Sequence, residues 1–123
     1  MNLRKFRLAS LAALLSLQAL PTYATVYQGT VTNVTAAFGT IYVFINNGSF
    51  GGSQGSCPTG TGMVFSIPAS PSASDFGKAM VSIALTARVT GQLVYAAGDG
   101  ICTNGNPYNG TGSEGLAYLD LKG

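Results

Sequence analysis

The sequence predicts a mainly β domain with one helix late in a run of short strands. Runs rich in β-branched and aromatic residues alternate with glycine-rich turns through most of the chain. The segment from Asp75 to Cys102 differs, because it contains an amphipathic helix, a stop at Thr90-Gly91-Gln92, a short strand and a cysteine. A single helix at this point narrows the architecture to a small barrel or a small sandwich.

The first 24 residues are typical of a secretory signal peptide. A basic start, Arg4 to Arg7, precedes an apolar run over residues 8–20, and Ala24 ends a stretch with small residues where a signal peptidase reads them. A membrane-spanning helix needs roughly 20 apolar residues, more than this run supplies. We therefore expect cleavage after Ala24, a secreted or periplasmic protein, no membrane insertion, and a single mature domain over residues 25–123.

The mature domain carries few charges. Half of the six basic residues lie in the leader, which leaves three basic and four acidic side chains and a net charge of −1. Binding to nucleic acid needs clustered Lys and Arg, so we exclude nucleic acid as a partner. The remaining charged residues are Lys78, Arg88, Lys122, Asp75, Asp99, Glu114 and Asp120.

The first half of the mature domain predicts three strands. Residues 25–34 are rich in β-branched side chains, with Gly29 as a candidate bulge, and residues 63–67 form a shorter apolar run. Residues 40–45 are continuously apolar and aromatic, which is typical of a strand buried on both faces or deep in a barrel. A loop rich in Gly and Ser, residues 48–62, separates the second strand from the third.

The helix has recognisable signals at both ends. Ser72 and Asp75 fit a capping box with an acidic first turn, and Gly91 suits the left-handed position just past a helix. Arg88 lies in the last turn, where the helix dipole favours a cation. The predicted core face is an apolar stripe at helical spacing, formed by Phe76, Met80, Ile83 and Ala87 and widened by Val81 and Leu85. Among the phenylalanines, we expect Phe44, Phe65 and Phe76 in the core.

Two further strands follow the helix. Residues 93–97 and 116–121 have strand patterns, and a second glycine-rich loop, residues 98–115, connects them. The predicted order is therefore β-β-β-α-β-β. A five-stranded, partly open barrel with its helix between strands three and four is the OB-fold, in which the helix would close one end of the barrel. The alternative is a small antiparallel sandwich with one covering helix.

Cys57 and Cys102 are the only cysteines in the sequence. Because both lie in the mature part of a chain that we expect to be exported, we predict that they form a disulfide. This bond would tie down the loop over residues 48–62. A free thiol or a metal ligand is the alternative, but the sequence has no histidine and no Cys-x-x-Cys pair. We expect no metal and no cofactor.

The sequence offers little for catalysis. The absence of histidine removes the common catalytic triads. Asp99 and Glu114 flank the last glycine-rich loop, and a small hydrolase using both carboxylates is one alternative function; solvated loop charges are the simpler interpretation. Residues 110–115 match G-x-G-x-x-G, but a strand follows where a dinucleotide site needs a helix. We therefore expect a protein that is not an enzyme.

A tyrosine in the last loop is the best local candidate for ligand binding. Tyr108 lies between Asn106 and Asn109, in a run of Asn, Gly and Thr. An aromatic ring among amides and hydroxyls can stack on a sugar and hydrogen-bond its hydroxyl groups. The alternative is a loop tyrosine that packs back on the barrel.

The run Ala84-Leu-Thr-Ala-Arg-Val-Thr-Gly-Gln-Leu-Val94 resembles the joint between helix and strand in pertussis-like toxin B subunits, that of subtilase cytotoxin included, and in related small exported bacterial proteins of unassigned role. The resemblance implies an OB-fold and, for the toxins, a pentameric ring that binds sialylated glycans. The family's sugar-contacting serine precedes a glycine in the first strand, where this chain has Gln28. Its sugar-contacting tyrosine corresponds to Gly98 here.

Three functions remain open from the sequence. The leading expectation is a secreted, non-enzymatic OB-fold binding protein that takes a glycan or a protein partner on one face of the barrel and on the loop over residues 98–115. The candidate ligand-binding residues are Gln28, Asn106, Tyr108 and Asn109. By the resemblance to toxin B subunits, the ligand is a glycan and the chain forms a ring. The second is an interaction protein of the cell envelope, whose exposed strand edge pairs with a protein partner. The third is the hydrolase built on the two carboxylates.

Overall fold

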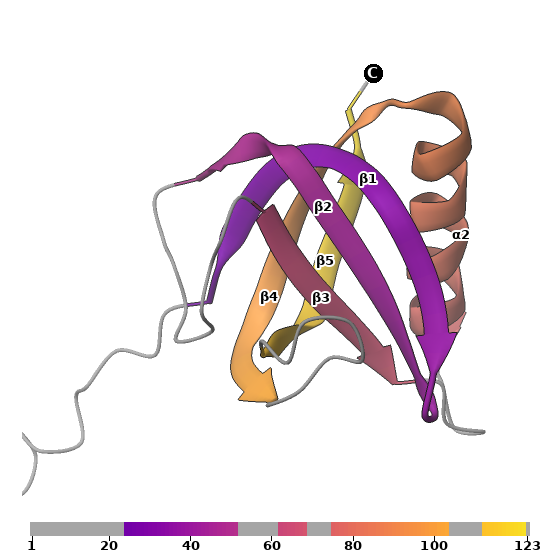
Figure 1. The fold of residues 1–123 in the computed structure, drawn as a ribbon, viewed down its shortest axis with the longest axis vertical. Helices are drawn as coiled ribbons and strands as arrows, with labels where there is room; N and C mark the ends of the chain where they lie inside the picture. Colours follow the sequence, from indigo (N-terminus) through magenta and orange to yellow (C-terminus); the bar gives the residue numbers. More distant parts are fainter. Residues whose placement is uncertain (1–23, 52–61, 69–74, 104–111, 123) are drawn as a thin grey trace, which may run out of the picture.

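The computed structural model describes residues 24–51, 62–68, 75–103 and 112–122 (Figure 1). The predicted signal peptide, up to residue 23, lies outside these ranges. So do four of the predicted site residues, Cys57, Asn106, Tyr108 and Asn109. The expectations that rest on them therefore stay predictions.

The described residues form five strands and one helix in the predicted order. The strands are β1 Val26–Ala37, β2 Thr40–Phe50, β3 Gly62–Pro68, β4 Leu93–Thr103 and β5 Ser113–Leu121, and the helix α2, Asp75–Thr90, lies between β3 and β4. This confirms the mainly β class and the position of the helix. β1, β2 and β4 each extend beyond the ends that the sequence predicted.

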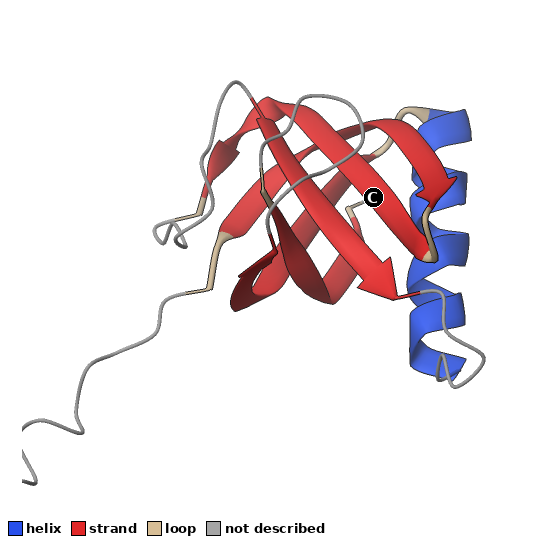
Figure 2. Ribbon diagram, turned by 60° about the horizontal axis from the view of Figure 1, so that its bottom comes forward, coloured by secondary structure: helices blue, strands red, loops and turns tan. Residues whose placement is uncertain are grey.

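The five strands close into a barrel. Their order is β1-β2-β3-β5-β4, and β4 returns to pair with β1. The pairs are antiparallel except for β3 and β5, which run parallel and meet at Phe65–Glu114 and Ser66–Gly115. The sandwich alternative is therefore wrong. Figure 2 shows the strands wrapped into the barrel with α2 along one side of it.

α2 packs against β1, β3 and β5 through a face of mainly small residues. The buried helix residues are Gly77, Met80, Ala84 and Ala87. The predictions that place Phe76 and Leu85 on the buried face are wrong, because their side chains are 59% and 49% exposed. Glycine and alanine let the helix backbone lie close to the strands, so the buried face is centred on them and Phe76 falls outside it.

The end of α2 follows the predicted capping chemistry. Gly91 has a φ of 71°, and its N–H donates to the Ala87 carbonyl oxygen at 2.9 Å. A glycine tolerates this left-handed conformation without steric cost, which is why the helix stops here. No helix in the described part of the chain is long and apolar enough to cross a membrane.

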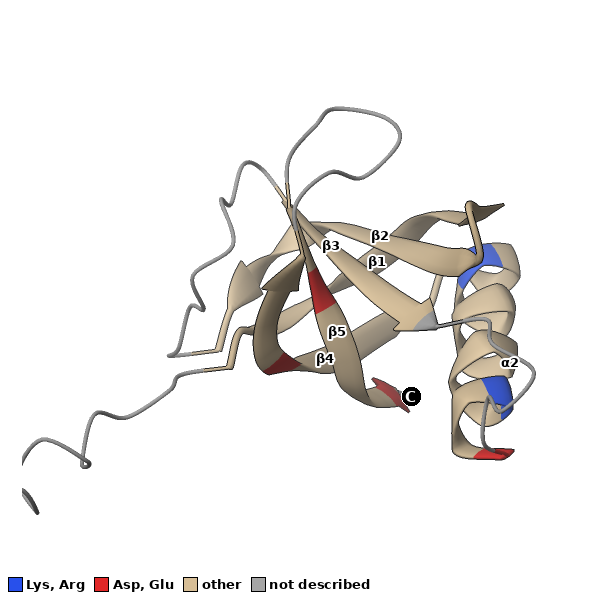
Figure 3. Cartoon of the chain, turned by 90° about the horizontal axis from the view of Figure 1, so that it is seen from below, with Lys and Arg blue, Asp and Glu red and all other residues tan. Residues whose placement is uncertain are grey.

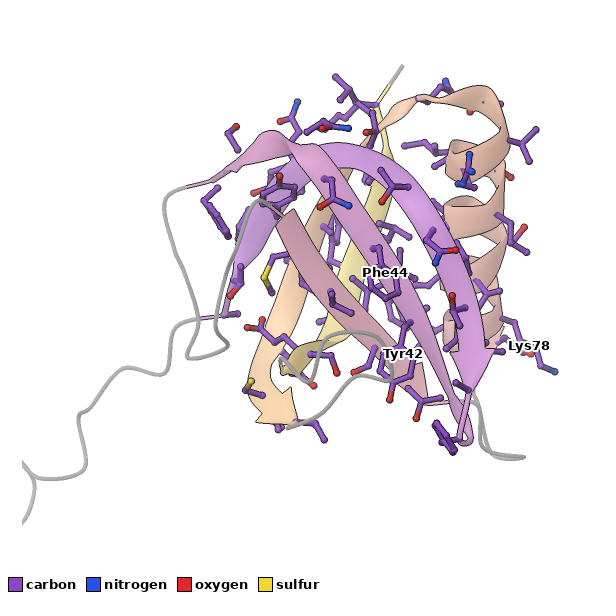
Figure 4. All side chains as sticks on the ribbon, viewed as in Figure 1. Tyr42, Phe44 and Lys78 are labelled. Atoms are coloured by element: carbon purple, nitrogen blue, oxygen red, sulfur yellow. The ribbon has the colours of Figure 1, made fainter. Side chains whose placement is uncertain are left out.

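β2 is covered on both faces, as its continuous apolar sequence predicted. Val43 and Ile45 are fully buried in the barrel core with Phe65. Successive side chains of a strand point to opposite faces, so Tyr42 and Phe44 lie on the other face of β2 (Figure 4). Tyr42 is nevertheless only 8% exposed, whereas Phe44 is half-buried and lies outside the core in which it was predicted.

β1 has a bulge at Gly29, which lies close to Gly48 of β2. The register between these strands shifts between Gln28 and Thr30, which confirms Gly29 as a bulge position. On the opposite strand, the Gly48 N–H donates to the Tyr27 hydroxyl at 3.0 Å. A Cβ on Gly48 would overlap the Gln28 carbonyl group and lie 2.7 Å from the Gly29 Cα. The two strands can therefore approach this closely only without a side chain at Gly48.

Gly48→Ala is expected to destabilise the protein by roughly 1–3 kcal/mol, because a methyl group forced against backbone atoms must displace a strand. Gly77→Ala is the matched control. A Cβ there would lie 3.7 Å from the Ile67 Cγ2, an ordinary contact, and alanine is the better helix former by roughly 0.5–1 kcal/mol. In urea unfolding, the same change of glycine to alanine should therefore lower the free energy of unfolding at position 48 and raise it at position 77. Equal effects would contradict the close packing at Gly48.

Candidate ligand-binding surface

Gln28 lies on the outer surface of the barrel. Its neighbours Tyr27 and Gly29 are buried, and Gln28 itself is exposed, as strand alternation requires. In the register of the sheet, Gln28 pairs with Ser49 of β2 on one side and with Tyr95 of β4 on the other. The sequence-predicted residue therefore lies in a row of outward-facing side chains that crosses three strands.

The row continues onto β5, where aromatic and charged groups meet. Tyr95 pairs with Asp120, and Tyr118 and Lys122 flank Asp120 along the chain. The Tyr95 and Tyr118 rings are in edge contact, with centroids 6.0 Å apart and an interplanar angle of 84°. We call the set of Gln28, Tyr95, Tyr118, Asp120 and Lys122 the tyrosine platform.

Lys122 lies close to two other residues of the tyrosine platform. Its Nζ lies 5.4 Å from the centroid of the Tyr95 ring and 3.6 Å from Asp120 Oδ2. The side chains of Lys122 and Asp120 are 48% and 43% exposed, so their ion pair adds little to stability. Because the ammonium covers Tyr95, Tyr118 is the ring left to contact a ligand, and it is 49% exposed.

These groups suit a ligand with both apolar and polar faces. An exposed tyrosine offers a flat apolar surface with a hydroxyl at its tip. The Gln28 amide, the Asp120 carboxylate and the Lys122 ammonium supply donors and acceptors around it. A sugar ring presents C–H groups on its faces and hydroxyl groups at its rim, so it matches this arrangement in both respects.

Gly98, which the resemblance to toxin B subunits would match to a sugar-contacting tyrosine, faces the interior of the barrel. Gly98 is buried, and a Cβ there would overlap the carboxylate of Glu114. The backbone of Gly98 is also engaged, because its N–H donates to the Thr25 carbonyl oxygen at 2.8 Å. The inward orientation of this position thus excludes a sugar-contacting side chain at Gly98.

Glu114 is the most deeply buried charged residue that the structure describes. It is 0% exposed. Its Oε1 accepts a hydrogen bond from Thr25 Oγ1 at 2.8 Å, and its Oε2 accepts from the Thr25 N–H at 3.0 Å. The Gly100 N–H lies 3.4 Å from the same Oε2. The carboxylate therefore accepts three hydrogen bonds and is shielded from solvent.

Asp99 lies on the other face of the β4–β5 ribbon. It is exposed, and its Oδ1 accepts a hydrogen bond from the Ile101 N–H at 2.8 Å. A Cβ on Gly115 would meet the Asp99 carboxylate, just as one on Gly98 would meet that of Glu114. Two carboxylates on opposite faces share no space for a substrate, so this geometry argues against the paired-carboxylate hydrolase. Among the described residues, no group of three or more His, Cys, Asp and Glu side chains could hold a metal.

The tyrosines of the platform were missed from the sequence, although a signal for them exists. Tyr95 stands between two small apolar residues in strand four, and Tyr118 precedes a leucine in strand five. Period-2 alternation would have placed both outside the barrel. Their meeting with Gln28 depends on the pairing of β1 with β4, which no local pattern reports.

Comparison of the chain with protein-family models, with curated proteins and with solved structures gave no match.

Proposed function

We propose that the protein is an exported binding protein that takes a carbohydrate on the tyrosine platform. The fold part of the proposal is that the barrel is an OB-fold. Its support is the strand order, the parallel contact of β3 with β5, and the helix between β3 and β4. Export rests on the leader that ends at Ala24. The ligand would therefore be a glycan of a cell surface or of the envelope.

The main support for a carbohydrate ligand is the exposed Tyr118 ring, which lies beside an amide and two opposite charges. Tyrosine is enriched at binding surfaces because its ring is apolar while its hydroxyl forms hydrogen bonds. The proposal also includes Asn106, Tyr108 and Asn109, on the loop that precedes β5, as a second set of ligand-binding residues.

Tyr118→Ala is expected to weaken glycan binding at least tenfold, about 1.4 kcal/mol or more, because truncation removes the stacking surface. Tyr118→Phe keeps the ring and should retain most of the affinity. Phe38→Ala is the matched control, since Phe38 is 92% exposed in the turn between β1 and β2, away from the tyrosine platform. Binding is measured on a panel of sialylated and neutral oligosaccharides.

Two results would contradict the proposed function. If the wild-type protein binds no oligosaccharide of the panel at high protein concentration, the glycan is the wrong ligand class. If it binds and Phe38→Ala weakens binding as much as Tyr118→Ala does, the site lies elsewhere on the protein.

A second candidate function is self-assembly through the outer face of α2. Leu85 and Val89 are 49% and 87% exposed, and Leu93 at the start of β4 is 44% exposed. A hollow lined by Leu85, Thr86, Val89 and Thr90 lies on the same face. We propose that a second copy of this chain covers it, as in the pentameric ring that the toxin resemblance implies. A closed barrel offers a partner little free strand edge, so the strand-edge alternative is less favoured.

Light scattering tests the ring. We expect an assembly larger than a monomer, and Val89→Asp should dissociate it, because a carboxylate would then be buried in the contact. Phe38→Asp is the matched control, because it places a carboxylate at an equally exposed apolar residue that lies in the turn between β1 and β2 and not on α2. A monomeric wild-type protein would exclude this assembly.

A further inference from the structure

In the part of the chain that the structure describes, no basic side chain pairs with the buried carboxylate of Glu114. Among the described residues, the only ion pair is that of Asp120 with Lys122. Figure 3 shows the basic residues of α2 at one side of the barrel, away from the acidic residue near the start of β5. A carboxylate that is 0% exposed and hydrogen-bonded only by neutral groups is costly to bury.

The main partner of Glu114 is the residue that export places at the new N-terminus. Thr25 donates to the carboxylate through both its backbone N–H and its hydroxyl, and its carbonyl oxygen accepts from the Gly98 N–H. Thr25 is 0% exposed. The predicted cleavage separates Ala24 from Thr25, so the nitrogen 3.0 Å from Glu114 Oε2 is the one that the peptidase frees.

We infer that removal of the leader turns the Thr25 nitrogen into an ammonium group that pairs with the buried carboxylate of Glu114. The peptidase hydrolyses the Ala24–Thr25 amide with one water molecule. The C–N bond breaks, and the water oxygen becomes part of the Ala24 carboxylate. Both water protons are transferred to the Thr25 nitrogen, which becomes –NH₃⁺. A neutral amide donor is thereby replaced by a charged one, which adds the Coulomb attraction of a full positive charge to a hydrogen bond that the carboxylate already strengthens.

The pairing makes the mature N-terminus part of the fold. It couples β1, which starts at Val26, to β4 and β5 through one carboxylate, and it stabilises the mature chain but not the precursor. Since Thr25 is buried, the peptidase must act before the barrel closes on this residue. The inference rests on the proposed export and on cleavage after Ala24, and it is independent of the ligand.

A double-mutant cycle tests the pair in the oxidised mature chain. One form begins at Thr25, and the other carries a single extra glycine that restores the amide N–H. We expect Glu114→Gln to raise the unfolding equilibrium constant at least tenfold more in the first form than in the second. Asp120→Asn, which removes an exposed ion pair, should act equally in both forms. An equal effect of Glu114→Gln in both forms would overturn the inference.

A second measurement needs no variant. Periodate cleaves a vicinal amino alcohol, which in an unglycosylated protein only an N-terminal Ser or Thr presents. In the exported protein, mass spectrometry should show oxidation of Thr25 at least tenfold slower in the folded state than in urea. Equal rates would overturn the inference, and so would an N-terminus other than Thr25. Neither result would bear on carbohydrate binding, which the oligosaccharide panel tests separately.

Discussion

Replacing Phe65 with alanine is expected to lower the free energy of unfolding by about 3–5 kcal/mol, which is the usual cost of removing a buried phenylalanine. Phe65 is 0% exposed in the middle of β3. It pairs with Val43 of β2 on one side and with Glu114 of β5 on the other, where the barrel closes. A small domain has only about 5–15 kcal/mol of stability in total, so this variant should lose a large share of it.

Two other phenylalanines serve as controls for Phe65→Ala. Phe38 is 92% exposed and Phe76 is 59% exposed, so alanine at either position should change stability by about 0.5 kcal/mol or less. The φ of Phe38 is positive, a conformation that residues with a Cβ adopt at some cost. Because alanine keeps the Cβ, the substitution leaves this cost unchanged. Equilibrium unfolding in urea measures all three variants. A cost at Phe76 equal to that at Phe65 would contradict the orientation of α2.

Loss of the predicted Cys57–Cys102 disulfide is expected to cost roughly 3–5 kcal/mol in the chain-entropy model, because the bond closes a long loop. Cys102 is half-buried and lies opposite Glu114 in the β4–β5 register. The double variant Cys57→Ala, Cys102→Ala avoids leaving a free thiol. Its urea midpoint should fall, and a reductant should lower that of the wild-type protein without affecting the variant.

The oxidation state is checked directly by mass. The exported protein should be lighter than its reduced form by two hydrogen atoms and should resist alkylation until it is reduced. If both cysteines of the native protein react with iodoacetamide without a reductant, the disulfide is absent and the stability loss has no basis.

The elements could be predicted because their patterns are local. The β-branched first strand, the apolar second strand and the capped helix each depend on neighbours within a few residues. The ends of the strands were harder to predict from the sequence. Asn46, Asn47 and Gly48 suggested that the second strand stops, yet β2 continues to Phe50 with Asn47 at a φ of 57°. Pairing with β1 across the bulge outweighs the turn propensity of these residues.

The buried helix face and the candidate site depended on information that is not local. The apolar stripe selected large residues, whereas the barrel accepts Gly77, Ala84 and Ala87 because they allow a close approach. Gln28 was found through a resemblance, but its neighbours were not. Its contact with Tyr95 comes from strands far apart in the chain, and sequence patterns do not encode that register.

The central claim is that the tyrosine platform binds a carbohydrate, and an NMR titration of the mature domain tests it most directly. With the oligosaccharide that binds best, we predict that the shifted amide signals cluster at Gln28, Tyr95, Tyr118, Asp120 and Lys122, and that Tyr118→Ala abolishes the shifts. Shifts confined to α2 around Val89, or to residues 104–111, would contradict the assignment of the ligand site to the tyrosine platform.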